Sequence, residues 1–319
     1  MLLVVAFLLA DSFQVDFQAG LAALNQSNLP AAQSNLEAAS KLQPANPRVW
    51  LALAETYRRL HQADAADRAA LRVEKLTNDP AVLHTLSVYY SEAGNFARAE
   101  DLMRAAIAQN RFDESYYFEL ADLCLKHQQF AAALETLDAG RKLFDKSPQL
   151  ELASGVAYYG LRRFAEAIDA FLRTIELDPG VPQPYLFLGR IWEQAEDQQP
   201  RIRAVFAAFA QTAPGNYLSG YLYAKSLALE NPGQAEALLR RSIALNDRFP
   251  DSHFDLGVLL ERQQRFAEAA REIERAIVLN PRDPAPHYRL SRLYERLGNT
   301  AAAAAERALH EKLSAGGTR

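Results

Sequence analysis

One stretch of this sequence occurs twice, and the distance between its copies restricts the folds that the chain can adopt. Residues 162–180 read RRFAEAIDAFLRTIELDPG, and residues 264–282 read QRFAEAAREIERAIVLNPR. The copies lie 102 residues apart, which is three times 34. A period of 34 residues is typical of an array of helix pairs, so the sequence predicts a helical repeat protein that grows by adding units.

An alanine marks the second helix of most predicted pairs, at the place where that helix crosses the first. These crossing alanines are Ala32, Ala66, Ala99, Ala133, Ala167, Ala269 and Ala303. The first helix carries a large residue followed by a small one, which also lets the two backbones approach. Counting by this period predicts nine units: residues 13–46, 47–79, 80–113, 114–147, 148–181, 182–216, 217–249, 250–283 and 284–317.

This order of residues resembles the tetratricopeptide repeat family over almost the whole chain, residues 13–317. The resemblance rests on the period, the residue classes and their order together. It implies an all-α fold, a right-handed superhelical solenoid of about nine antiparallel helix pairs. In such an array each pair buries one face against its neighbour, because a single pair cannot cover its own apolar surface.

Three of the predicted units depart from the pattern. In the sixth, Glu196–Pro200 is expected to lengthen or kink the turn, and Ile202 or Arg203 replaces the small residue. In the seventh, Gly220 stands where a large residue normally packs. In the ninth, polar residues such as Arg307 occupy sites that are usually apolar, which is what a terminal capping helix needs.

Composition and charge exclude several classes of protein. The chain is 49% hydrophobic and 23% charged, so it is not mainly disordered. With 35 basic and 39 acidic residues it has no excess of positive charge to hold a phosphate backbone, and nucleic acid is not an expected partner. Its one cysteine, Cys124, excludes an intrachain disulfide, so packing alone must hold the fold.

Residues 1–12 form a separate apolar segment. The run Leu2–Ala10 is too short to span a bilayer as a helix, but it fits the apolar region of a signal peptide cut after Ala10. A signal peptide or an anchor here would be the chain's one expected contact with a membrane. We therefore predict a periplasmic or secreted bacterial protein. The first basic residue is Lys41, and Leu8 stands where a small residue is preferred, so the alternative is a helix that caps the array of a cytoplasmic protein.

No catalytic or metal-binding pattern emerges from the sequence. His310 and Glu311 begin a zinc-protease string, but Ser314 stands where its second histidine must be. His253 and His287 lie one repeat apart, about 8–10 Å or more, which is too far for two ligands of one ion. We therefore predict a protein that is not an enzyme and that needs no cofactor.

The resemblance implies that the first helices line a concave groove, whose residues recur at the repeat period. An apolar and aromatic ladder then runs beside a mixed polar track, a surface suited to an extended peptide or a partner helix. The groove candidates are Phe17, Leu51, His84, Phe118, Leu152, Tyr159, Leu186, Arg190, Tyr221, Lys225, Phe254, Tyr288 and Arg292. Some family members hold a chaperone's C-terminal carboxylates with a lysine–asparagine clamp, which this sequence does not have.

The sequence thus predicts a non-enzymatic scaffold that binds a peptide or protein segment in its groove. One alternative is an accessory array that serves an enzyme, for example a glycosyltransferase, on another chain or in a lost domain. Another is a self-assembling array. The polar, alanine-rich last helix argues against open stacking, so a monomer is favoured.

Overall fold

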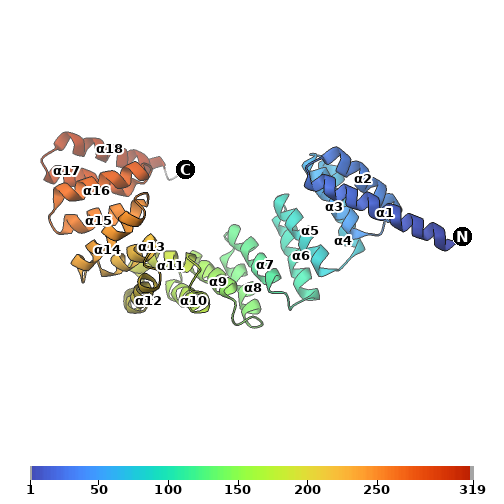
Figure 1. Cartoon of the computed structure of the whole chain (residues 1–319), viewed down its shortest axis with the longest axis horizontal. Helices are drawn as coiled ribbons and strands as arrows, with labels where there is room; N and C mark the ends of the chain where they lie inside the picture. Colours follow the sequence, from blue (N-terminus) through green and yellow to red (C-terminus); the bar gives the residue numbers. More distant parts are fainter. Residues whose placement is uncertain (1, 317–319) are drawn as a thin grey trace. The chain divides into compact units, whose positions relative to one another are not determined.

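The chain is helical throughout the part that the structure describes. This computed structural model describes the backbone of residues 2–316 and the side chains of residues 12–315. Within that range there are eighteen α-helices, two short 3-10 helices and no strand (Figure 1). The all-α architecture predicted from the sequence is therefore confirmed.

The helices form antiparallel pairs, in which we call the first helix A and the second B. The pairs are α1 (Leu2–Asn25) with α2 (Leu29–Leu42), α3 (Pro47–Arg59) with α4 (Ala63–Leu76), α5 (Pro80–Glu92) with α6 (Phe96–Gln109), α7 (Glu114–Lys126) with α8 (Phe130–Arg141), α11 (Gln183–Arg190) with α12 (Gln199–Thr212), α13 (Tyr217–Leu227) with α14 (Pro232–Leu245), α15 (Pro250–Arg262) with α16 (Phe266–Leu279), and α17 (Pro284–Arg296) with α18 (Thr300–Gly316). By their order in the chain, α9 (Pro148–Gly160) is called an A helix and α10 (Phe164–Leu177) a B helix.

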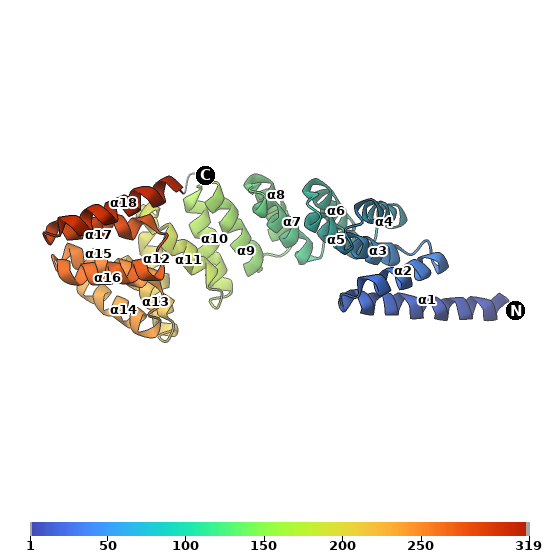
Figure 2. The same cartoon turned by 90° about the horizontal axis from the view of Figure 1, so that it is seen from above.

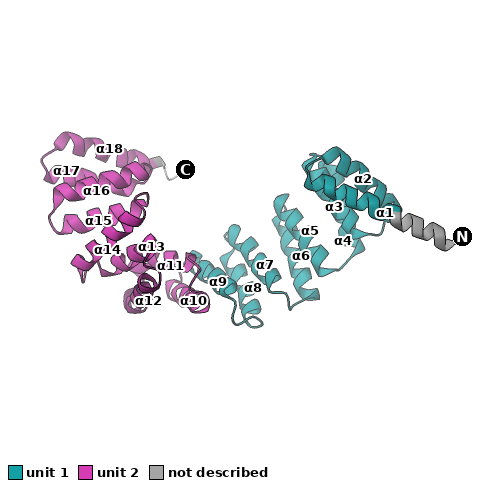
Figure 3. Ribbon diagram, in the orientation of Figure 1, with its two compact units in different colours: residues 1–162 teal, residues 163–319 magenta. Residues whose placement is uncertain are grey.

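The chain divides into two compact units, residues 1–162 and 163–319 (Figure 3). In unit 2 the helices α15 to α18 lie side by side, each against the next in the chain (Figure 2). The sixth pair is irregular: α11 ends at Arg190, and the 3-10 helices η1 (Trp192–Gln194) and η2 (Glu196–Gln198) lead into α12. The side chain of Trp192 is buried at this break.

Seven A helices are followed at once by one residue in the left-handed region; in the sixth repeat this residue, Glu196, lies in η2, and the turn after α13, which the structure describes in full, has none. The positive φ values are found at Ser27, His61, Gly94, Gln128, Arg162, Glu196, Gln264 and Gly298. In the first turn, the N–H of Asn28 then donates to the carbonyl of Ala23 at 2.8 Å, a bond that satisfies a carbonyl at the helix end.

Small residues hold the A and B helices together at their crossings. All seven crossing alanines are at most 2% exposed, and Ala235 fills the same role in α14. In α12 the place of the crossing alanine is taken by Ile202, which is fully buried, as is Phe206 one turn later. Gly257 in α15 is packed so closely that an added Cβ would lie 2.5 Å from Ile273 Cγ1.

We expect Gly257→Ala to lower the free energy of unfolding by about 1–3 kcal/mol, because its Cβ overlaps the buried Ile273. Gly220→Ala is the matched control within an A helix, since its Cβ would meet only the Leu238 carbonyl at 3.5 Å. That variant should gain roughly 0.5–1 kcal/mol from a less flexible unfolded chain. Urea unfolding of the two variants measures both changes, and shifts of the same sign would contradict this account of the crossing.

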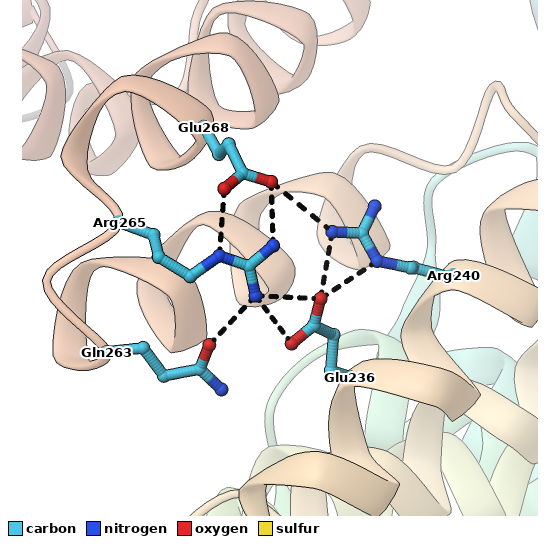
Figure 4. Close-up of polar contacts among 5 residues, drawn as sticks. All are labelled: Glu236, Arg240, Gln263, Arg265 and Glu268. Carbon is cyan, nitrogen blue, oxygen red and sulfur yellow. Dashed lines mark hydrogen bonds and ion pairs between the residues drawn. The ribbon is translucent and has the colours of Figure 1, made fainter.

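Successive B helices of unit 2 are joined by a charged network (Figure 4). Arg265 donates to Glu236 at 2.9 Å and to Glu268 at 2.7 Å, and Arg240 also donates to Glu236 at 2.9 Å. Burial alone would raise the pKa of Glu236, but hydrogen bonds from Arg240 and Arg265 outweigh it, and the pKa is lowered. The network therefore ties α14 to the start of α16.

The prediction of an exported protein concerns the first turns of α1, whose side chains lie outside the described residues. Among the described residues, no helix has both the length and the apolar character to cross a membrane. Cleavage after Ala10 and export stay predictions.

Candidate functional site

The thirteen groove candidates all lie on A helices, six in unit 1 and seven in unit 2. Their exposure differs. The exposed ones are Leu186, Arg190, Tyr288 and Arg292. The half-buried ones are Phe17, Leu51, His84, Phe118, Leu152, Tyr159, Lys225 and Phe254. Only Tyr221 among the thirteen is buried.

Unit 1 does not gather its candidates into one pocket. His84 bonds through Nε2 to Glu119, and its ring lies 5.3 Å from that of Tyr116. A pocket of ≈ 330 Å³ lies between α5 and α7, and its lining includes Val88 and Asp122. None of the six candidates in unit 1 belongs to its lining. The side chain of His84 therefore serves packing between α5 and α7.

Unit 2 brings four candidates together in two adjoining pockets. The Tyr288 pocket, of ≈ 570 Å³, is lined by Phe254, Glu261, Ala285, Tyr288, Arg289, Arg292 and His310. The Asp255 pocket, of ≈ 200 Å³, is lined by Glu193, Ala224, Lys225, Ala228, Leu239, Phe254, Asp255, Val258, Leu259, Arg262 and Arg289. Because Phe254 and Arg289 line both pockets, the two cavities are neighbours on the A helices α13, α15 and α17.

The walls of the Tyr288 pocket are held in place by polar contacts. Tyr288 is 46% exposed, and its hydroxyl accepts a hydrogen bond from Arg292 at 3.3 Å. The ring of His310 lies 5.3 Å from that of Tyr288, and His310 Nδ1 donates to the Pro284 carbonyl at 2.9 Å. Arg289 pairs with Glu261 at 3.0 Å. The pocket therefore offers an aromatic face beside fixed charges.

The Asp255 pocket contains a carboxylate that the protein does not fully satisfy. The Tyr221 hydroxyl lies close enough to Asp255 to influence its pKa, but Asp255 Oδ2 is buried and has no hydrogen-bond donor among the described residues. Burial raises the pKa of Asp255, while the charge of Lys225 and the hydroxyl of Tyr221 lower it, and the net pKa is raised. A buried acceptor without a donor costs stability, so it needs an explanation.

The buried position of Tyr221 corrects the expectation that its ring lines the groove. Its side chain is 7% exposed and packs edge-on against Phe249, with ring centroids 5.0 Å apart. The physical reason is register: Gly220, not Tyr221, lies 34 residues before Phe254. Ser219 and His253 confirm that register, since each donates to the carbonyl six residues earlier. A Tyr221 variant therefore probes packing, not an exposed anchor.

The described residues contain no group of three histidine, cysteine, aspartate or glutamate side chains that could hold a metal ion. Cys124 is 1% exposed, and burial raises the pKa of its thiol. A buried thiol with a raised pKa packs as a small apolar residue. The geometry of the two pockets suits binding.

A family model described as a tetratricopeptide repeat matches residues 17–81, 85–149, 152–217, 227–285 and 254–316. The chain belongs to the tetratricopeptide repeat family. Members of this family bind protein or peptide partners and generally act as non-catalytic scaffolds, so the chain is a protein-interaction scaffold. The predicted family is confirmed. No curated protein matches the chain.

Solved structures of similar fold are distant in sequence. The C-terminal part of a TPR repeat-containing protein from Cytophaga hutchinsonii is 14% identical, with 85% of this chain and 97% of that chain covered and a TM-score of 0.53. Yeast Tom70 is 13% identical, covering 95% and 92%, with a TM-score of 0.46. MamA is 18% identical, covering 53% and 93%, with a TM-score of 0.45. The first of these shows that the repeat fold is shared.

Proposed function

We propose that unit 2 of this tetratricopeptide repeat protein binds an extended segment of a partner protein along α13, α15 and α17. The observation that carries the proposal is the pair of adjoining pockets that share Phe254. Two neighbouring cavities of this kind can each receive one side chain of the same segment. Phe254 and Tyr288 then act as aromatic anchors, with Lys225 and Arg292 fixing the register.

The arrangement favours binding without rearrangement. The contacts of Tyr288 with Arg292 and His310, and of Arg289 with Glu261, hold the pocket walls in place. Less side-chain freedom is then lost on binding, so more of the contact energy contributes to affinity. Leu186 on α11, which is 39% exposed, adds an apolar contact for a longer segment.

The test is affinity capture from the native cell with the wild type and with a Phe254→Ala/Tyr288→Ala variant. We expect the variant to lose the specific partner. Once the partner is identified, calorimetry should give a loss of about 2 kcal/mol or more for the two anchors together.

The control is Val278→Ala, which removes an exposed side chain of similar apolar character from the B helix α16. It should capture the same proteins as the wild type. Equal capture by the wild type and the anchor variant would overturn the proposal. An enzyme among the captured proteins would favour the accessory role that the sequence also allows.

A further inference from the structure

The Asp255 pocket contains a hydrogen-bond acceptor, Asp255, and a donor, Lys225, that do not bond to each other. Asp255 Oδ2 is buried without a donor. Lys225 lines the same cavity and forms no hydrogen bond or ion pair with the residues that the structure describes, although its charge lowers the pKa of Asp255. Since a buried acceptor without a donor costs free energy, a ligand that donates to Asp255 Oδ2 gains that energy on binding, while the Lys225 ammonium offers a donor to the same ligand.

The charges around the cavity select the kind of ligand. Asp255 and Glu193 are negative, Lys225 and Arg262 are positive, and Arg289 is already paired with Glu261. A cationic group would be repelled by Lys225 and Arg262, and an anionic group would be repelled by Asp255 and Glu193. A neutral group is repelled by neither pair, and one that both donates and accepts hydrogen bonds can bind Asp255 and Lys225 together.

The remaining walls suit a short aliphatic stem. Ala224, Ala228 and Val258 line the cavity, and Phe254 separates it from the Tyr288 pocket. A volume of ≈ 200 Å³ accepts a side chain but not a large ring system with its own polar groups.

We propose that the Asp255 pocket binds the side-chain carboxamide of an asparagine or glutamine in the partner segment. The carboxamide NH₂ donates to Asp255 Oδ2, and its carbonyl accepts from the Lys225 ammonium. This inference rests on the proposed function, because the side chain arrives on the segment that Phe254 and Tyr288 anchor.

The probes are the blocked amino acids N-acetyl-glutamine methylamide and N-acetyl-asparagine methylamide, compared with their alanine, glutamate and lysine counterparts. Protein labelled with ¹³C at its alanine methyl groups reports the site through Ala224 and Ala228, while Ala285 reports the neighbouring Tyr288 pocket. We expect a carboxamide probe to shift Ala224 and Ala228 with a dissociation constant on the order of 10-fold below that of the alanine probe.

Lys225→Met and Asp255→Ala should each abolish this preference, and Lys225→Arg should retain part of it. Lys41→Met, on the exposed end of α2, is the matched control and should leave the preference intact. Stronger binding of the lysine or glutamate probe, equal binding of the alanine probe, or no shift with any probe would overturn the carboxamide site. Those results would not change whether the wild type captures a partner protein that the Phe254→Ala/Tyr288→Ala variant loses. Failure of this proposal is therefore distinguishable from failure of the proposed function.

Discussion

Phe171→Ala is expected to lower the free energy of unfolding by about 3–5 kcal/mol, a large loss for a single substitution. Phe171 lies on α10, has no exposed surface, and stacks on Phe187 of α11 with ring centroids 4.8 Å apart and an interplanar angle of 8°. Removing the ring leaves a cavity between α10 and α11 at the irregular sixth repeat, where α11 is only 8 residues long.

Urea unfolding measures this loss, and Phe112→Ala is the matched control because its ring is 67% exposed. The control should stay within about 0.5 kcal/mol of the wild type. Hydrogen exchange should show the largest loss of protection in α10 and α11, since the stability of a repeat array is a sum of unit and neighbour terms. A loss below ~1 kcal/mol for Phe171→Ala would contradict the packing described for this junction.

The fold could be predicted because the features that set it are local and periodic. An alanine every 34 residues marks a helix crossing, and the structure buries each of the seven crossing alanines. The turn geometry could not be predicted in the same way. Six of the eight left-handed turn residues are not glycine, for example Gln128 and Arg162, so the usual glycine signal is missing.

A second periodic feature, a hydrogen bond from an A-helix side chain to the preceding loop, could not be recognised in the sequence because different residue types make it. In six of the nine repeats one A-helix residue donates to the carbonyl six residues earlier, for example through an indole in Trp50, a phenol in Tyr117 or an imidazole in His287. The bond recurs while the residue type changes, so a comparison of residue classes does not find it. The sequence gives the residue type at this position, whereas the structure shows that each of these side chains reaches the carbonyl six residues earlier.

Some of the pocket residues could be predicted from the repeat period and one could not. Lys225, Phe254, Tyr288 and Arg292 were expected from their period, and they line the two pockets. Asp255 was not predicted as a site residue, although it directly follows Phe254 in the sequence. Its importance depends on the neighbours that successive repeats bring to it, Tyr221 and Lys225 on α13, and on a register in the seventh unit that the break at Glu196–Pro200 obscures.

Tyr221→Phe is expected to lower the free energy of unfolding by about 1–3 kcal/mol, because it removes the hydroxyl that lies beside the buried Asp255 carboxylate and lowers its pKa. The double variant Tyr221→Phe/Asp255→Leu removes both polar partners and should recover this loss or exceed the wild type in stability. A thermodynamic cycle with both single variants gives the coupling, which should fall between roughly 0.5 and 3 kcal/mol.

The dependence on pH separates this explanation from a general packing effect. The pKa of Asp255 is raised in the folded protein, so between its unfolded and folded values the folded state binds more protons. Stability from this group therefore rises as pH falls through the folded pKa, and above that pH the charged carboxylate is a net cost. The wild type should gain stability relative to the double variant as pH is lowered from neutral toward about 4. Two results would contradict this explanation: a stability difference between the wild type and the double variant that does not depend on pH, or a double variant much less stable than either single variant. If the wild type follows this dependence, the Asp255 carboxylate lowers stability at neutral pH, a cost for which the proposed binding role gives a reason.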